Sequence, residues 1–165
     1  MERKYIACDP ELCTGCQLCE MACSAEKEKA FHPDVSRIHA VHISPLSAIS
    51  IACRFCENTP CISACPREAL QMDEEANVIR LDKARCIGCG WCIEACEFGA
   101  IVVDRSCKSV AICDLCENRS RPKCVEFCPK QALCVSTFEI TAQGAREKTA
   151  RSLSLSGGSK PQKTT

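Results

Sequence analysis

The residues best suited to chemistry in this sequence are cysteines, and sixteen of the 19 fall into four groups of four. Groups one and three share the pattern C-x2-C-x2-C-x3-C, and groups two and four end in Cys-Pro. In chain order the groups are Cys13, Cys16, Cys19 and Cys23; Cys53, Cys56, Cys61 and Cys65; Cys86, Cys89, Cys92 and Cys96; and Cys113, Cys116, Cys124 and Cys128. The alternation of two group types indicates an internal duplication.

This spacing predicts iron–sulfur chemistry. Three cysteines within seven residues let one short loop wrap a cubane cluster, and glycine at the tight positions, Gly15 and Gly88, removes a Cβ clash. Structural zinc would require two CxxC pairs separated by a longer gap. A disulfide framework would leave each crowded triplet unable to pair without strain. We therefore predict that the sixteen cysteines bind four [4Fe–4S] clusters.

Composition and charge limit which partners and which cellular compartment are expected. Lys plus Arg and Asp plus Glu are equal at 21 each, so the chain alone is formally neutral. Four oxidised clusters with thiolate ligands would bring the charge to roughly −8. The basic residues between the groups then read as counter-charge, and no nucleic-acid partner is expected. The odd cysteine count and the absence of a secretory signal pattern favour a cytoplasmic metalloprotein. No window is apolar enough to predict a membrane span.

The expected secondary structure is sparse. A helix rich in Ala, Glu and Lys is predicted at 20–31. Short strands are predicted at 69–72, 78–82, 100–104 and 132–138. From residue 141 the chain becomes polar and predicts a tail that is flexible or bound to a partner, and that could tie subunits into a larger assembly.

Groups two and three together, from Cys53 to Ile101, resemble a bacterial 2[4Fe–4S] ferredoxin, with Cys65-Pro66 followed by Arg-Glu-Ala-Leu. Over residues 5–138 the chain resembles the four-cluster electron-transfer subunits of multi-subunit oxidoreductases. The resemblance implies an α+β fold of two ferredoxin modules in one compact unit of residues 1–140. The inner module would span about 48–104, the outer module about 5–35 plus 105–138, and the tail 141–165.

The same resemblance implies crossed ligation, in which the last cysteine of each group serves the partner group's cluster. The four implied ligand sets are Cys13, Cys16, Cys19 and Cys128; Cys113, Cys116, Cys124 and Cys23; Cys53, Cys56, Cys61 and Cys96; and Cys86, Cys89, Cys92 and Cys65.

The expected function is a non-catalytic subunit that relays single electrons through the clusters. It would join a catalytic subunit, for which a tungsten or molybdenum formate or aldehyde oxidoreductase is favoured, to another redox partner such as a flavin or iron–sulfur subunit in a hetero-oligomer. Alternatives are a nickel–iron hydrogenase or CO dehydrogenase as partner, a free polyferredoxin, and a metal-dependent regulatory protein. No nucleophile with a general base, phosphate loop or dinucleotide fingerprint predicts catalysis by the chain itself.

Several residues are left over by this assignment. Cys8, Cys107 and Cys134 are expected to be buried as small packing residues beside strands, with redox sensing or a disulfide as the alternative. The three histidines, His32, His39 and His42, are expected on the surface or in loops. Trp91, between two predicted ligands, is expected either to shield a cluster from water or only to pack.

Overall fold

The computed structural model describes residues 3–104 and 107–155. Its strands form four separate two-stranded antiparallel sheets within these ranges. β1 (Lys4–Cys8) pairs with β8 (Leu133–Thr137), β2 (Ile38–Ser44) with β3 (Ser47–Ala52), β4 (Leu70–Asp73) with β5 (Val78–Leu81), and β6 (Val102–Asp104) with β7 (Ser109–Ala111). The first of these pairs joins the two ends of the predicted cluster-binding region, because Lys4 lies opposite Thr137.

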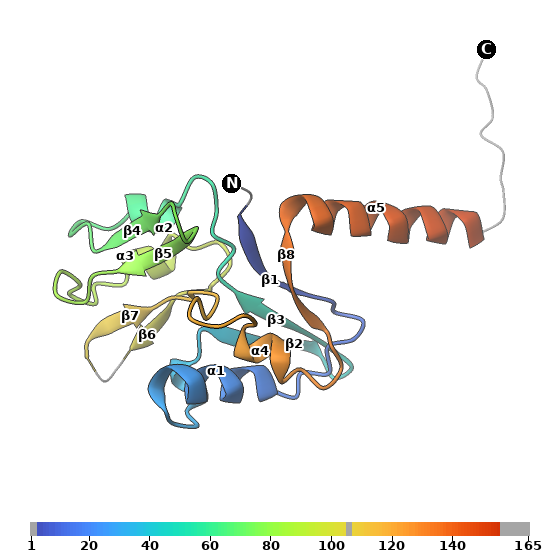
Figure 1. Ribbon diagram of the computed structural model, residues 1–165, viewed down its shortest axis with the longest axis horizontal. Helices are drawn as coiled ribbons and strands as arrows, with labels where there is room; N and C mark the ends of the chain where they lie inside the picture. Colours follow the sequence, from blue (N-terminus) through green and yellow to red (C-terminus); the bar gives the residue numbers. More distant parts are fainter. Residues whose placement is uncertain (1–2, 105–106, 156–165) are drawn as a thin grey trace, which may run out of the picture.

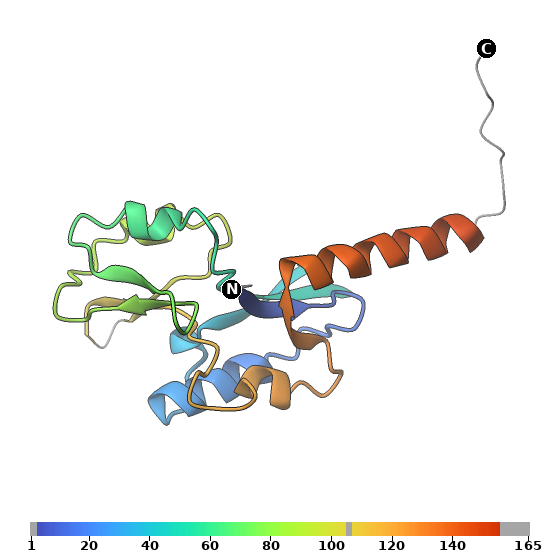
Figure 2. The same ribbon diagram turned by 45° about the horizontal axis from the view of Figure 1, so that its top comes forward.

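Short helical segments accompany the cysteine groups. α2 (Pro60–Ser63), α3 (Trp91–Glu94) and α4 (Lys123–Glu126) are single turns, and η1 (Pro33–Val35) is a 3-10 turn. Figures 1 and 2 show α2, α3, β4 and β5 gathered in one part of the molecule and α1 and α4 in another.

α1 (Leu18–Glu28) is the predicted helix, shifted towards the N-terminus. Its end is set by Lys29, which adopts a left-handed conformation (φ 56°). One face buries Cys19, Cys23 and the carboxylate-bearing Glu20, as expected for positions four residues apart. The Glu20 carboxylate accepts a hydrogen bond of 2.6 Å from the backbone N–H of Ala40, which fixes α1 against β2.

α5 (Phe138–Leu155) occupies most of the region predicted as a polar tail. Its residues have high helix propensity but no broad apolar face, so the helix projects from the rest of the molecule in Figure 1. Its first turns are anchored, since the Thr141 hydroxyl lies 2.5 Å from the Tyr5 hydroxyl and Phe138 packs on the Tyr5 ring. Residues 156–165 of the predicted tail lie outside the described residues. None of the described helices has the length and apolar character to cross a membrane.

The strands predicted at 69–72, 78–82, 100–104 and 132–138 are confirmed with small shifts as β4, β5, β6 and β8. β1, β7 and the β2–β3 hairpin were not predicted. The largest fully buried side chains of the core include Tyr5, Ile38, Phe55, Leu70 and Val78. Aliphatic side chains and thiols complete the core, and the cysteines in the core cluster are Cys19, Cys23, Cys53, Cys61, Cys92, Cys113 and Cys124. Because thiols make up part of this core, its stability depends in part on what those thiols bind.

Gly88 allows a stability test of one cysteine loop. Its φ of +65° favours glycine, and a Cβ there would lie 2.4 Å from the Lys108 carbonyl oxygen. Gly99 has a similar φ of +59° but open space around its Cα. We expect Gly99→Ala to cost about 1 kcal/mol for the left-handed backbone, and Gly88→Ala to cost clearly more, because the Lys108 carbonyl must also move. Anaerobic thermal unfolding followed by circular dichroism measures both variants, and equal shifts would contradict the close contact.

Candidate metal centres

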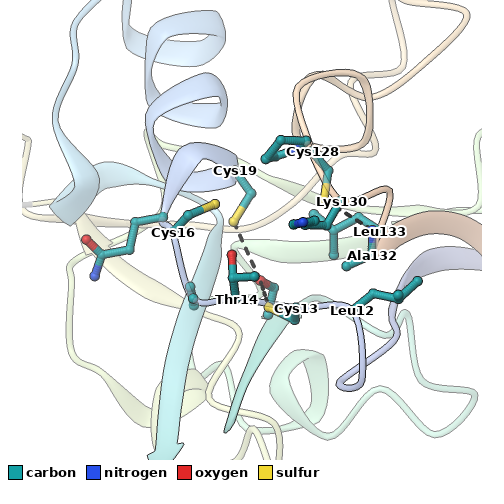
Figure 3. A pocket seen from close by; sticks show the side chains of 14 residues that line it. Leu12, Cys13, Thr14, Cys16, Cys19, Cys128, Lys130, Ala132 and Leu133 are labelled. Carbon is teal, nitrogen blue, oxygen red and sulfur yellow. Dashed lines mark hydrogen bonds between the residues drawn. The ribbon is translucent and has the colours of Figure 1, made fainter. Parts of the chain in front are cut away.

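Four thiols from two distant segments surround the first candidate site. Cys13, Cys16, Cys19 and Cys128 line one cavity. Figure 3 shows Cys16 just before α1 and Cys19 in its first turn, while Cys128 reaches the same space from the loop before β8. We call this cavity site 1. It brings together the four cysteines of the first implied ligand set.

Two further cavities are built in the same way. Cys53, Cys56, Cys61 and Cys96 line the cavity that we call site 2. Cys65, Cys86, Cys89 and Cys92 line the cavity that we call site 3. In both cavities three cysteines come from one group and the fourth comes from the other group of the predicted inner module.

The remaining four predicted ligands are all buried, and we refer to them as site 4; they are Cys23, Cys113, Cys116 and Cys124. Burial raises the pKa of Cys113 well above its usual value, and the neighbouring Cys124 and Cys23 raise it further. Burial likewise raises the pKa of Cys124, with Cys23 and Cys116 adding to the effect. These mutual effects place the side chain from α1 beside the three from the fourth group.

Thiols this deeply buried favour an occupant that accepts thiolates. Burial raises the pKa of Cys53 to about 12, so at neutral pH an empty site would hold neutral thiols. A metal replaces those protons, because thiolate is the ligand form. Four thiols that line one cavity, three of them from one cysteine group, fit a polynuclear cluster.

The thiols also reveal which sites are neighbours. Cys19 of site 1 contributes to the raised pKa of Cys124 in site 4, after burial and the nearer thiols. Cys53 of site 2 contributes in the same way to Cys113 of site 4. The pKa of Cys92 in site 3 is raised to about 11, first by burial and then by Cys61 of site 2. These electrostatic influences between neighbouring thiols follow the order site 1, site 4, site 2, site 3.

The solvent exposure of the predicted ligands differs between the end sites and the middle sites of this order. Cys16 of site 1 and Cys89 of site 3 are solvent-exposed, whereas no predicted ligand of the two middle sites is exposed. Around Cys89 the side chains of Ile87 and Trp91 are exposed as well, so Trp91 packs little of its ring. The chain of sites thus has two accessible ends and a buried middle.

Backbone amides point at the sulfurs in a repeated pattern. The fourth cysteine of groups two, three and four accepts a hydrogen bond from the amide four residues later, at distances of 3.3, 3.4 and 3.2 Å; the pairs are Cys65 with Ala69, Cys96 with Ala100, and Cys128 with Ala132. Although burial opposes it, donation from amides lowers the pKa of Cys65, with Ala69 first among the donors. These three alanines are buried, and their recurrence four residues after the last cysteine of these three groups is the sequence signal of this hydrogen bond.

Cys23 departs from this pattern because α1 continues past it. The amide of Arg37 donates to its sulfur at 3.4 Å instead. The Arg37 guanidinium and Lys27 both bind the Asp114 carboxylate, at 3.2 and 2.6 Å. Burial raises the pKa of Asp114, but the Lys27 ammonium, the Arg37 guanidinium and the Cys116 amide together outweigh it, so the pKa is lowered overall. This partly buried ion pair ties α1 to the loop that carries Cys113 and Cys116.

The left-over residues only partly match expectation. Cys107 and Cys134 are exposed, so the prediction that they are buried packing residues is wrong for both. Cys107 donates to the Asp104 carboxylate at 2.9 Å, and Cys134 is exposed to solvent in β8. Cys8 is half-buried next to site 1.

Of the histidines, His32 and His42 are exposed as predicted, whereas His39 is half-buried in β2. No histidine lines the three cavities of sites 1, 2 and 3.

Comparison with known proteins agrees with this geometry. A family model described as a 4Fe-4S dicluster domain matches residues 45–138. The polyferredoxin-like subunit of aliphatic sulfonate oxidoreductase from Pyrococcus furiosus is 39% identical over 127 residues, which cover 77% of this chain and 72% of the relative. The putative electron transport protein YsaA of Escherichia coli is 36% identical over 156 residues, 88% of this chain and 98% of the relative. The thiosulfate reductase electron transfer subunit PhsB of Salmonella typhi is 32% identical over 139 residues, 76% of this chain and 71% of the relative.

The fold also has a counterpart among solved structures. A chain of the active-site complex BamBC of benzoyl coenzyme A reductase aligns with a TM-score of 0.50 at 24% identity, covering 82% of this chain and 78% of that chain. This similarity concerns the fold alone.

The crossed assembly of sites 2 and 3 predicts which variants share a defect. Cys96→Ser should remove the same cluster as Cys61→Ser, although Cys96 is closer in sequence to the cysteines of site 3. Cys65→Ser should instead match Cys86→Ser. Electron paramagnetic resonance (EPR) of the reduced proteins identifies the missing signal in each variant, and Cys134→Ser, an exposed non-ligand, serves as control. If Cys96→Ser and Cys86→Ser lost the same signal, the crossed partition would be wrong.

Proposed function

The chain belongs to the 4Fe-4S dicluster domain family, and from that membership we propose that it is a non-catalytic subunit that relays single electrons through four [4Fe–4S] clusters. The observation that supports this proposal is that thiols from two distant segments line each of three cavities, with Cys16 and Cys89 exposed at sites 1 and 3. An electron relay needs access for partners at its ends and insulation between them.

The chain's own residues would do three things for this relay. The sixteen cysteines hold the clusters at fixed spacing. The backbone amides of residues such as Ala69, Ala100 and Ala132 donate to the sulfurs and so stabilise their negative charge. The burial of Cys113, Cys124, Cys53 and Cys61 keeps water from the two middle sites. The clusters themselves supply the one-electron chemistry when bound.

The proposed partner at one end is a large catalytic oxidoreductase subunit. Relatives are named as electron-transfer or polyferredoxin-like subunits of such enzymes, which supports a place in a hetero-oligomer. A tungsten or molybdenum oxidoreductase acting on formate or an aldehyde is our preferred partner, ahead of a nickel–iron hydrogenase or CO dehydrogenase. The other end would serve a flavin or iron–sulfur protein, and we propose that the complex works in the cytoplasm.

A freely diffusing polyferredoxin is the second candidate. It is favoured by a relative whose whole length the chain nearly covers and whose name is simply an electron transport protein. The two candidates differ in native mass: a subunit co-migrates with a larger partner on size-exclusion chromatography of an anaerobic extract, whereas a free carrier elutes near 18.0 kDa.

Metal analysis tests the relay directly. Anaerobically purified protein should contain about sixteen iron and sixteen acid-labile sulfide per chain, the sum of four cubanes, and should bleach reversibly when reduced with dithionite. Removal of iron with a chelator under denaturant-free conditions should also lower helix and sheet content, because the thiol core loses its cross-links. Stoichiometric zinc, or iron for two clusters only, would refute the four-cluster relay.

A further inference from the structure

Ser50 lies on β3 directly behind site 1, between two of its thiols. The Ser50 Oγ is 3.6 Å from the Cys19 Sγ and 3.8 Å from the Cys13 Sγ. The residue is only 6% exposed, and within the described ranges its hydroxyl has no other hydrogen-bond partner. A buried hydroxyl without a partner costs free energy, so these two sulfurs are what satisfies it.

The direction of this hydrogen bond follows from the state of the sulfurs. Between a free thiol and a hydroxyl either group can donate. A cysteine bound to a metal has lost its proton and can only accept. When site 1 is loaded, the Ser50 hydroxyl must therefore donate its one proton to Cys19 or Cys13.

The surrounding structure holds Ser50 in place for this contact. Its backbone N–H donates to the Cys8 Sγ at 3.3 Å, which joins β3 to β1 behind the site. Ser50 also lies opposite Ala40 in the β2–β3 hairpin, and the Ala40 amide is bound by Glu20 of α1. The hydroxyl is thus presented by a strand that is bonded on both sides, and not by a mobile loop.

We propose that Ser50 is a positioning residue that tunes the redox potential of the cluster in site 1. A donor to a ligand sulfur stabilises negative charge on the cluster, and the reduced form carries one more negative charge than the oxidised form. The Ser50 hydroxyl therefore favours the reduced cluster and raises its potential. The step is a one-electron reduction, with the electron supplied by the redox partner and with the hydroxyl proton remaining on Ser50.

This role rests on the proposed function and adds to it a residue that sets the redox potential of one end site. Site 1 is one end of the ordered sites, where Cys16 is exposed. The potential of an end site decides how readily an electron passes between the chain and the partner docked there.

The test compares Ser50→Ala with Ser50→Thr in the anaerobically purified holoprotein. Redox titration monitored by EPR should show one cluster shifted to lower potential in Ser50→Ala, by up to about tenfold in its reduction equilibrium, which is about 59 mV for one electron. The other signals should stay in place, and Ser50→Thr, which keeps the hydroxyl, should restore the potential. In addition, one exchangeable-proton coupling that the wild-type cluster shows should be absent in Ser50→Ala.

Ser136→Ala is the matched control. Ser136 is equally buried at 5% exposure, but its hydroxyl contacts Thr141 and the Thr137 carbonyl and no cysteine. All potentials should be unchanged in this variant.

Iron content separates the failure modes. If Ser50→Ala retains full iron and every potential is unchanged, the tuning role is refuted while the relay stands. If Ser50→Ala and Ser50→Thr both lose one cluster, Ser50 acts in assembly and the tuning role is again refuted. Wild-type protein without iron would instead refute the proposed function itself.

Discussion

Each thiol site requires two segments far apart in the sequence to meet, and the rest of the fold follows from this requirement. Site 1 joins the loop before α1 to the loop before β8, and the β1–β8 pairing holds those two segments side by side. Site 2 joins the segments around Cys53 and Cys96. The sheets are only two strands wide and could not stand alone. Clusters bound at the proposed sites would cross-link these segments, so cofactor binding and folding would be coupled.

Local sequence signals predicted the parts of the fold that local interactions determine. The cysteine spacing identified every thiol that lines the three cavities, the alternating pattern around 69–82 gave the β4–β5 hairpin, and the Ala-rich run gave α1. The β2–β3 hairpin was missed because His39, His42 and several serines interrupt its apolar residues. β1 and β8 pair across more than a hundred residues, and nothing within either segment specifies such a partner.

The tail shows a different limit. α5 has residues of high helix propensity but lacks the apolar stripe by which helices are recognised, and its first turns are fixed by contacts with Tyr5 and by Lys148, whose ammonium lies 3.1 Å from Asp9. The role of Ser50 could not be predicted from the sequence either. It is one serine among several in the hairpin, and only the folded structure places it between two sulfurs.

The contrast between exposed ends and a buried middle also has a consequence for the lifetime of the protein in air. Oxidants reach a cluster through its accessible sulfur, so damage should start at Cys16 or Cys89 and not at Cys113 or Cys53. The loss of one terminal cluster would leave the two central ones in place and much of the molecule still cross-linked. Such a protein would remain folded and coloured and yet be disconnected from one partner. Iron content alone would therefore overstate how many molecules in an aged preparation can still conduct.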